Sequence, residues 1–276
     1  MKRNPSRRRL LAGVGAAAAA GLAGCSGATP FVGKRIEDDR TIATEGATAL
    51  TVDARVGDVT IRGEDRDDLH VRLVKQSSSV GVDLSKLDLT VDREGDQLEL
   101  ATRYTGDSSL LGGQPSMDLT IVVPRSLRVA ELAASVGDVL VEDVTGDLAV
   151  SVSVGETTIE NVDGAVTAEA STGDVHIKGA SAVGDVSASV GDLDLAVPAI
   201  DGDATFETST GDIDAALSPD LDADLAAETS VGDVTVEGLS LRNSSRTEQS
   251  VSGTLGDGGP TLGVETNTGD VHLSAL

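Results

Sequence analysis

The sequence predicts an all-β protein, a single-chain β-solenoid (β-helix-like) with about 18–21 residues per rung. Three observations support this fold class. A Ser-(Val/Thr)-Gly-Asp motif returns at nearly constant intervals, short segments of alternating apolar and polar residues lie between its copies, and aromatic residues are almost absent. The chain of 276 residues contains only Phe31, Tyr104 and Phe206 as aromatic residues. Its apolar content is therefore mainly Val, Leu, Ile and Ala, which suits a narrow interior filled by small side chains.

The motif copies are expected to form the corners of the rungs. Glycine adopts positive φ at a corner, and aspartate hydrogen-bonds to nearby backbone amides there. From residue 138 onward, the acidic residues of the motif follow one another after 18, 18, 18, 20, 21 and 37 residues, the last interval being close to two periods with an insertion. The predicted turn pairs are Gly57-Asp58, Gly137-Asp138, Gly155-Glu156, Gly173-Asp174, Gly191-Asp192, Gly211-Asp212, Gly232-Asp233 and Gly269-Asp270.

Alternation between the corners predicts strands. In the segment 148–154, Leu148, Val150, Val152 and Val154 fall on one face, which is expected to be buried. No part of the chain after the signal segment shows a convincing helical period. Antiparallel hairpins in a sandwich are the alternative, but equal 18-residue spacing is natural for rungs and arbitrary for hairpins.

A serine stands two residues before most of the motif glycines. Because a catalytic serine would be one special residue, equivalent serines instead predict a structural ladder of hydroxyl groups, each bonding to its neighbour. These residues are Ser135, Ser153, Ser171, Ser189, Ser209 and Ser230.

Two segments depart from the repeat. Antiparallel hairpin excursions are expected near residues 87–123, with Leu89 and Val91 among the inward residues, and near residues 246–266. The expected domains are a signal peptide (1–24), a tether with a first strand or cap (25–45) and the solenoid (46–276).

The first residues predict export and lipid anchoring. Arg7 and Arg8 lie in "SRRRLL", which is similar to a twin-arginine signal, and a 15-residue apolar run, too short to span a bilayer, follows from Leu10 to Gly24. The segment "LAGC" resembles a lipobox, which makes Cys25 the expected site of lipidation. Two acyl or alkyl chains on Cys25 give stable anchoring, so the membrane is an expected partner and the outer face of the cell membrane the expected location. A plain signal peptide with an incidental cysteine is the alternative.

Charge and cysteine content restrict the possible functions. Removing residues 1–24 takes away five positive charges and no negative ones, so the net charge goes from −25 to −30. Such a surface repels nucleic acid and indicates a salt-adapted, haloarchaeal-type extracellular protein, with cation binding as the competing interpretation. Cys25 is the only cysteine, so no disulfide forms within the chain and no thiolate metal site can be built.

The order of the motifs resembles the putative-adhesin solenoid family, a domain of unknown function found in cell envelopes and related to auto-transporter adhesin head domains. The resemblance lies in "VGDVTIRG" (56–63), "MDLTIVVPRSL" (117–127), the repeated corners and "GVETNTGDVHLSAL" (263–276), and it covers residues 45–276. It implies a β-helix-like fold, an envelope location and no established enzymatic activity. The expected function is a non-catalytic surface module that binds a glycan or protein ligand or acts as a scaffold.

Two other functions remain open. A calcium-dependent β-roll is one, but the corners lack its doubled glycines, and Asp220, Asp222 and Asp224 have EF-hand-like spacing without the required glycine and glutamate. A polysaccharide-active β-helix enzyme is the other, with the pairs Asp192/Asp194 and Asp212/Asp214 as candidate carboxylates. We expect neither an enzyme nor a metal site, and no cofactor.

A few single residues carry further expectations. His176 and His272 hold the same rung position and are expected to face outward, several rungs apart. Asn243 lies in an Asn-Ser-Ser acceptor pattern for N-glycosylation. Tyr104, together with Leu110 and Leu111, is a candidate partner contact or an end cap.

Overall fold

A computed structural model describes residues 33–44, 46–79, 81–106 and 114–276. The predicted export signal with Arg7 and Arg8, the lipidation site Cys25, and Leu110 and Leu111 lie outside these residues. Gly33–Leu276 forms one compact unit, and its described residues lie mostly in strands, with a single 3-10 turn, η1 (Leu84–Lys86). In this described part, no helix is long and apolar enough to cross a membrane.

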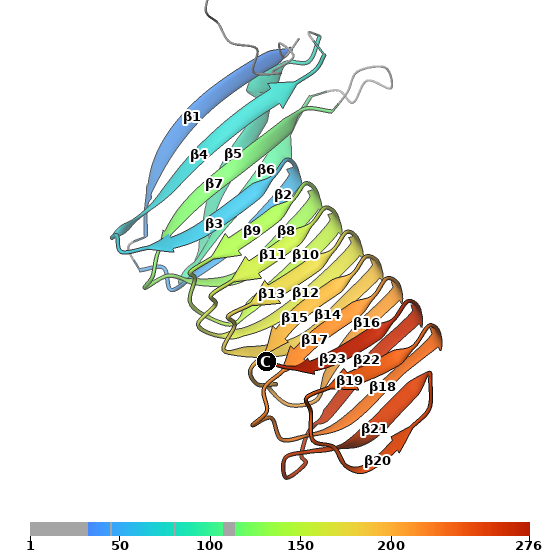
Figure 1. The fold of residues 1–276 in the computed structure, drawn as a ribbon. Helices are drawn as coiled ribbons and strands as arrows, with labels where there is room; N and C mark the ends of the chain where they lie inside the picture. Colours follow the sequence, from blue (N-terminus) through green and yellow to red (C-terminus); the bar gives the residue numbers. More distant parts are fainter. Residues whose placement is uncertain (1–32, 45, 80, 107–113) are drawn as a thin grey trace, which may run out of the picture. The chain divides into compact units, whose positions relative to one another are not determined.

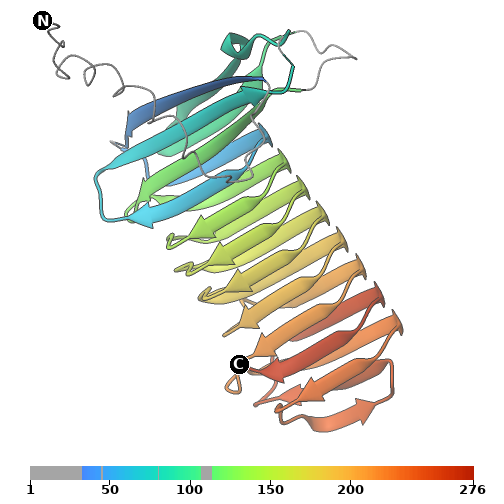
Figure 2. The same ribbon diagram turned by 45° about the horizontal axis from the view of Figure 1, so that its top comes forward.

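Two sheets run along the whole unit (Figures 1 and 2). The 11-stranded sheet has the spatial order β1 (Lys34–Ala43), β4 (Asp68–Ser77), β7 (Ser116–Pro124), β3 (Val59–Glu64), β9 (Val139–Glu142), β11 (Thr157–Glu160), β13 (Val175–Lys178), β15 (Leu193–Val197), β17 (Ile213–Leu217), β23 (Val271–Ala275), β19 (Val234–Glu237). The 12-stranded sheet has the order β20 (Arg242–Arg246), β21 (Ser250–Leu255), β18 (Ala223–Val231), β22 (Thr261–Thr268), β16 (Ala204–Thr210), β14 (Ala182–Val190), β12 (Ala165–Thr172), β10 (Leu148–Val154), β8 (Arg128–Val136), β2 (Ala49–Val56), β6 (Gln97–Tyr104), β5 (Leu87–Glu94).

The predicted solenoid is confirmed. A rung consists of a strand of the 12-stranded sheet, a corner and a strand of the 11-stranded sheet. The strands of neighbouring rungs pair in parallel, with few register shifts. In spatial order the rungs are β6–β7, β2–β3, β8–β9, β10–β11, β12–β13, β14–β15, β16–β17, β22–β23 and β18–β19. With strands about 4.8 Å apart, the 12-stranded sheet is about 53 Å long.

The spatial order of the rungs differs from their order in the sequence at both ends of the stack. The rung β22–β23 lies between β16–β17 and β18–β19, although it follows both in the chain. The rung β2–β3 likewise lies between β8–β9 and the strands β6 and β7. The 37-residue interval before Asp270 therefore reflects a detour after which the chain returns into the stack.

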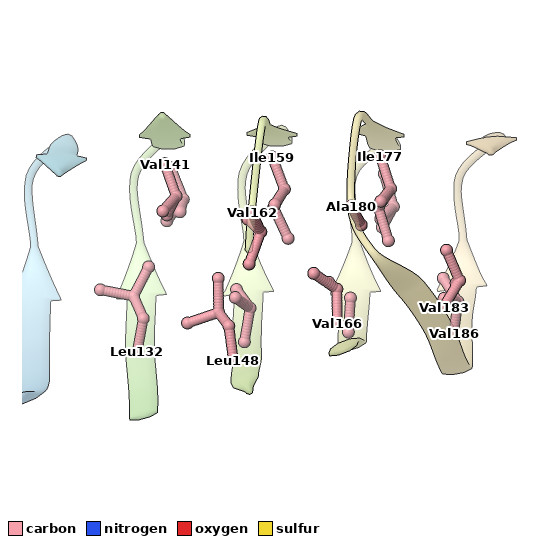
Figure 3. Close-up of a cluster of buried hydrophobic side chains, with 14 of the residues drawn as sticks. Leu132, Val141, Leu148, Ile159, Val162, Val166, Ile177, Ala180, Val183 and Val186 are labelled. Carbon is pink, nitrogen blue, oxygen red and sulfur yellow. The ribbon is translucent and has the colours of Figure 1, made fainter. Parts of the chain in front are cut away.

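The interior consists of columns of apolar side chains, one residue per rung (Figure 3). In the 11-stranded sheet, Val141, Ile159 and Ile177 follow one another in register and are fully buried. In the 12-stranded sheet, the column through Leu132 and Val186 includes Phe206, the ring in the repeat region, which is 0% exposed. Residue size within this column ranges from alanine at Ala168 to phenylalanine at Phe206.

Two expected core residues lie at the surface. Val154 is 47% exposed, because the chain begins to turn the corner before the motif glycine and the two residues preceding that glycine both point outward. Val91 is 40% exposed, since the edge strand β5 is exposed from Val91 to Glu94, whereas Leu89 and the cross-strand partner Leu100 are buried.

Antiparallel strands cover both ends of the stack. At one end, β5 pairs with β6, and β1 and β4 extend the 11-stranded sheet beyond β7. At the other end, the hairpin β20–β21 pairs with β18. This second excursion occupies 242–255, whereas residues from Thr261 onward return to parallel pairing.

An ion pair links the edges of the two sheets at the end that carries β1. The Arg40 guanidinium donates to Asp88 Oδ1 at 2.7 Å and to the Leu89 carbonyl oxygen at 2.8 Å, and the Lys75 ammonium lies 3.4 Å from the same Asp88 oxygen. The hydrogen bond from Arg40 lowers the pKa of Asp88. Arg40 thereby connects β1 of one sheet to β5 of the other.

Candidate functional site

The corners bring successive rungs into close contact. Gly173, for example, has φ +133°, and a Cβ atom placed on it would lie 2.0 Å from the carbonyl oxygen of Gly155 in the neighbouring rung. The same close approach recurs at the other seven predicted turn glycines, with Met117 taking the glycine's place in the outermost rung. Only a residue without a side chain fits there, so the glycines set the stacking distance of the rungs.

The corner aspartates hydrogen-bond to backbone amides as expected, but these amides belong to the adjacent rung, so the bonds form a ladder along the stack. The Oδ1 atom of one aspartate accepts the backbone N–H of the acidic residue in the adjacent rung, over 2.7–3.3 Å. The accepting residues are Asp118, Asp58, Asp138, Asp174, Asp192, Asp212 and Asp270. The sequence signal for this ladder was the nearly constant aspartate after each motif glycine. The short aspartate side chain has the right length to reach the backbone amide of the next rung.

The ladder has a gap at Glu156, whose longer side chain makes no such bond to Asp174 in the described structure. We expect Glu156→Asp to complete the ladder and raise the free energy of unfolding by about 0.5–1.5 kcal/mol, the usual net value of one hydrogen bond. Urea unfolding measures this. Asp174→Glu, which conserves charge but removes the bond to Asp192, is expected to lower stability by a similar amount, and equal stability of the two variants would contradict the ladder's role.

Asp118 begins the ladder and bonds to both Gln76 and the Asp58 amide. Burial, followed by the nearby Asp58 charge, raises the pKa of Asp118. A carboxyl group with a raised pKa favours the fold when protonated, and this contribution is lost as pH rises through its folded-state pKa.

Asp118→Asn is therefore expected to raise stability at neutral pH by about 0.3–0.5 kcal/mol, a small value because the group is partly screened by solvent. The gain should vanish as pH falls below the ordinary aspartate pKa, where this carboxyl is protonated in the folded and the unfolded chain alike. Thermal unfolding between pH 3 and pH 8 tests this, with exposed Asp201→Asn as a control for net charge. A gain that did not depend on pH would contradict it.

The six motif serines form the expected row along the sheet, but the expected hydrogen bonds between neighbouring serines are not found among the described residues. All six serines are exposed on the 12-stranded sheet, and among the described residues no hydrogen bond joins neighbouring members of the row. Next to this row runs a second exposed row of β-branched residues, in which Val136, Val154, Val190 and Val231 are 46–63% exposed. The corner therefore presents two parallel rows of small side chains to solvent.

Inward threonines replace these serines as the hydroxyl groups that bond between rungs. Thr208, Thr229 and Thr266 are buried and donate to the glycine carbonyl oxygens of adjacent rungs at 2.9–3.0 Å. Thr157 is also buried, at 1% exposed, but its hydroxyl has no partner in the described structure.

Thr157→Val is expected to stabilise the protein by about 1 kcal/mol, because an unsatisfied hydroxyl is replaced by a methyl group of similar shape. Val139 and Val175 already occupy this position in the two adjacent rungs. Thr208→Val removes a satisfied hydroxyl and is expected to cost about 1 kcal/mol. Guanidinium unfolding of the two variants compares them, and a loss of stability in Thr157→Val would overturn the interpretation.

The outer face of the 12-stranded sheet carries an acidic trough. One hollow, of about 500 Å³, is lined by Asp53, Asp92, Glu94, Glu99 and Glu131 together with Thr51 and Gln97. An adjoining hollow of about 260 Å³ shares Glu131 and is lined further by small residues, Glu169 and Asp185. This face repels anionic ligands and suits neutral or cationic ones.

The two predicted outward histidines lie in one row of the 11-stranded sheet. In register, the row contains His176, Asp194, Asp214 and His272. Only the strands β15 and β17 separate the histidines, because β23 returns to the stack beside β17; the expected separation of several rungs was too large. His176 lies 3.7 Å from Asp194 and 3.8 Å from Glu156, and the Thr235 hydroxyl lies 2.8 Å from His272 Nδ1.

The candidate catalytic pairs are distributed along these rows. Asp192 and Asp212 belong to the corner ladder, whereas Asp194 pairs with Lys178 at 3.1 Å and Asp214 is exposed. Each member thus has a counterpart in an adjacent rung.

The three aspartates with EF-hand-like spacing also make separate contacts. Asp222 accepts the Asp257 amide and Asp224 accepts the Thr254 hydroxyl, so both hold the terminal hairpin in place, and Asp220 is exposed in a turn. In the described part of the chain, no group of three or more His, Cys, Asp or Glu residues is arranged to hold a metal ion.

The remaining predicted positions lie at the two ends. Tyr104 ends β6 and is partly buried against the core, which places it at the end near β5. Asn243 lies in β20, the outermost strand of the 12-stranded sheet at the opposite end.

Stacked parallel rungs, glycine corners and apolar columns define a β-solenoid protein of the all-β class. Residues 116–274, more than half of the chain, match the family model described as Toastrack DUF4097, and the chain belongs to this family. No curated protein sequence matches this chain.

Three solved structures show weak similarity. A "putative cell adhesion protein" from Clostridium sporogenes ATCC 15579 is 14% identical, with 88% of this chain and 100% of that chain covered and a TM-score of 0.36. A "putative adhesin" from Bacteroides fragilis NCTC 9343 is 12% identical (88% and 97% covered, TM-score 0.37), and one from Parabacteroides distasonis ATCC 8503 is 13% identical (87% and 97%, TM-score 0.40). Similarity at this level does not establish what this chain binds.

Proposed function

We propose that this chain is a non-catalytic cell-surface lipoprotein, an adhesin-like binding module or envelope scaffold. The observation that carries the proposal is the stack of parallel rungs, which holds equivalent side chains in register in rows along the outer faces of the two sheets. Repeated rows suit a ligand or partner that is itself extended and repetitive, such as a glycan or an envelope protein. Catalysis instead needs one distinct constellation of groups.

The chemistry of the rows narrows the ligand. The acidic trough through Glu131 and the net charge of −25 favour neutral or cationic ligands over nucleic acid or anionic glycans. In the corner ladder, the aspartate Oδ1 atoms already accept backbone amides, which leaves fewer oxygens to coordinate calcium, an ion that requires six to eight. A calcium-dependent module is therefore the less favoured form of the same proposal.

The export and anchoring part of the proposal rests on the sequence. Arg7 and Arg8 direct twin-arginine export, residues 1–24 are removed, and the lipid on Cys25 holds the protein at the outer face of the membrane. The segment 25–45 then forms the tether and the strand β1, and residues 46–276 form the exposed solenoid.

Two experiments test the proposal. Purified residues 26–276 are incubated with whole cells and with isolated neutral and anionic envelope glycans at high salt, with heat-unfolded protein as the control. Saturable binding by the folded form alone supports a binding module. If neither form binds, only the scaffold role remains. Hydrolysis or cleavage of a glycan would overturn the non-catalytic assignment. Addition of calcium at constant ionic strength tests the calcium-dependent form.

Membrane attachment is tested separately with Cys25→Ser. The variant is expected to be exported and to appear in the soluble fraction outside the cell, while the native protein stays with membranes. Retention of Cys25→Ser in the membrane fraction would contradict lipid anchoring.

A further inference from the structure

The outer strand β20 (Arg242–Arg246) combines an acceptor motif with an accessible site. It is the last strand of the 12-stranded sheet and, among the described strands, pairs only with β21, so one of its edges is unpaired there (Figure 2). All five of its side chains are exposed. β20 lies at one end of the stack, and β1, the first strand of the unit, lies at the other end.

Asn243 occupies an unusual position in this strand. Arg242 pairs with Thr254 and Ser245 with Ser252, so that Asn243 and Ser244 together face the single residue Gly253 and form a bulge. A Cβ atom on Gly253 would lie 3.1 Å from the Arg242 carbonyl oxygen and 3.3 Å from Ser244 Cα, which shows how closely the bulge packs on this side. Asn243 has φ +50° and is exposed.

The amide of Asn243 is available for reaction. No hydrogen bond engages it among the described residues, whereas Asn161, which also has positive φ, donates from Nδ2 to Asp143 at 3.3 Å. The chain has four asparagines, and only Asn243 is followed by a residue other than proline and then by Ser or Thr, here Ser245. Motif, exposure and a free amide therefore coincide at one residue.

We infer that Asn243 is a site of N-glycosylation. This inference rests on the proposed function, because only an exported protein meets the donor, a lipid-phosphate-linked oligosaccharide outside the cell. A twin-arginine signal exports chains that have already folded, so the acceptor has to be exposed in the native structure, as Asn243 is.

The reaction is a glycosyl transfer without a redox change. Asn243 Nδ2 attacks the anomeric carbon of the oligosaccharide, a C–N bond forms, and the bond from this carbon to the phosphate oxygen of the lipid carrier breaks. The amide loses one proton, and the lipid phosphate leaves with the bonding electron pair. The product keeps a neutral amide linkage on an exposed edge strand.

The glycan would protect the end of the sheet. An edge strand offers unpaired N–H and C=O groups to other chains, and proteins block such edges with charges, bulges or covering groups. β20 already has a bulge and two arginines, and a bulky glycan beside them would prevent end-to-end pairing with a second copy.

The test uses the full-length protein isolated from the cells that make it, separated into surface and intracellular fractions. Cleavage after Glu237 and Glu248 releases the peptide 238–248, whose mass is measured. We expect this peptide from the surface fraction to be heavier by the mass of an oligosaccharide. The added mass should disappear in Asn243→Gln and in Ser245→Ala, and remain in Ser245→Thr and in Asn161→Gln, the matched control.

The outcomes separate this inference from the proposed function. Surface protein with an unmodified peptide overturns glycosylation while leaving export intact. Protein found only inside the cell, with an unmodified peptide, overturns both. Added mass that persists in Ser245→Ala would also overturn the inference, since the motif would then not direct the modification.

Discussion

A protein shortened to end at Pro260 is expected to lose most of its stability at the C-terminal end of the stack, although only 16 residues are removed. These residues form β22–β23, which lies between two other rungs. Its removal deprives β16–β17 and β18–β19 of their pairing partner and eliminates four fully or almost fully buried side chains, Leu262, Val264, Val271 and Leu273. At about 1.5–3 kcal/mol for each side chain, the loss is comparable to the whole stability of an ordinary domain.

Hydrogen exchange of individual amides measures this effect. Protection is expected to fall in β16–β19 and to persist in β8–β13. A protein shortened to end at Pro219 loses more residues but leaves β16–β17 as an intact outermost rung, so it serves as the control and is expected to keep protection up to β14–β15. Native protection of β16–β19 in the protein ending at Pro260 would mean that β18–β19 had closed directly onto β16–β17, contrary to this prediction.

Gly173→Ala is expected to lower the free energy of unfolding by about 3–5 kcal/mol, because backbone strain and a steric clash act together. The new methyl group would lie 2.0 Å from the Gly155 carbonyl oxygen, and φ is +133°. The surrounding backbone is fixed by hydrogen bonds on both sides, such as Gly155 N–H to Thr172 O and Gly173 N–H to Val190 O, so relief would require rungs to separate.

Gly202→Ala is the matched control for the effect of positive φ alone. Gly202 has φ +86°, but no atom lies within 4 Å of its added Cβ. Its substitution is expected to cost about 1–2 kcal/mol. Chemical unfolding of both variants gives the comparison, and equal losses would show that contact between rungs does not constrain the corner.

Much of the fold could be predicted from the sequence because its determinants are local. The glycine and aspartate of each corner, and the alternation between corners, are properties of a few neighbouring residues. The spatial order of the rungs was not predictable in the same way. Any rung offers the same backbone groups and a similar apolar column to any other, so nothing in "GVETNTGDVHLSAL" (263–276) specifies that it inserts between β16–β17 and β18–β19 instead of stacking on the far side of β18–β19.

The candidate site shows the same division. The outward orientation of the motif serines and aspartates could be predicted from their position beside the corner glycine. Which of them makes the bonds between rungs depends on the distance from a side chain to the next backbone amide. Aspartate spans that distance, whereas the serines point to solvent and the inward threonines make the hydroxyl bonds instead. Exposure of Val154 was missed because strict alternation ends at a corner.

The interior position of β22–β23 also determines how the stack resists mechanical force. In a simple solenoid the last strand is an edge strand, and a pull on the terminus unzips it one hydrogen bond at a time. Here β23 is bonded to β17 on one side and to β19 on the other, and the Leu276 amide bonds back to Leu217. A pull on this terminus loads two rows of hydrogen bonds together in shear, so the chain end is held more firmly than the outermost rung of the stack.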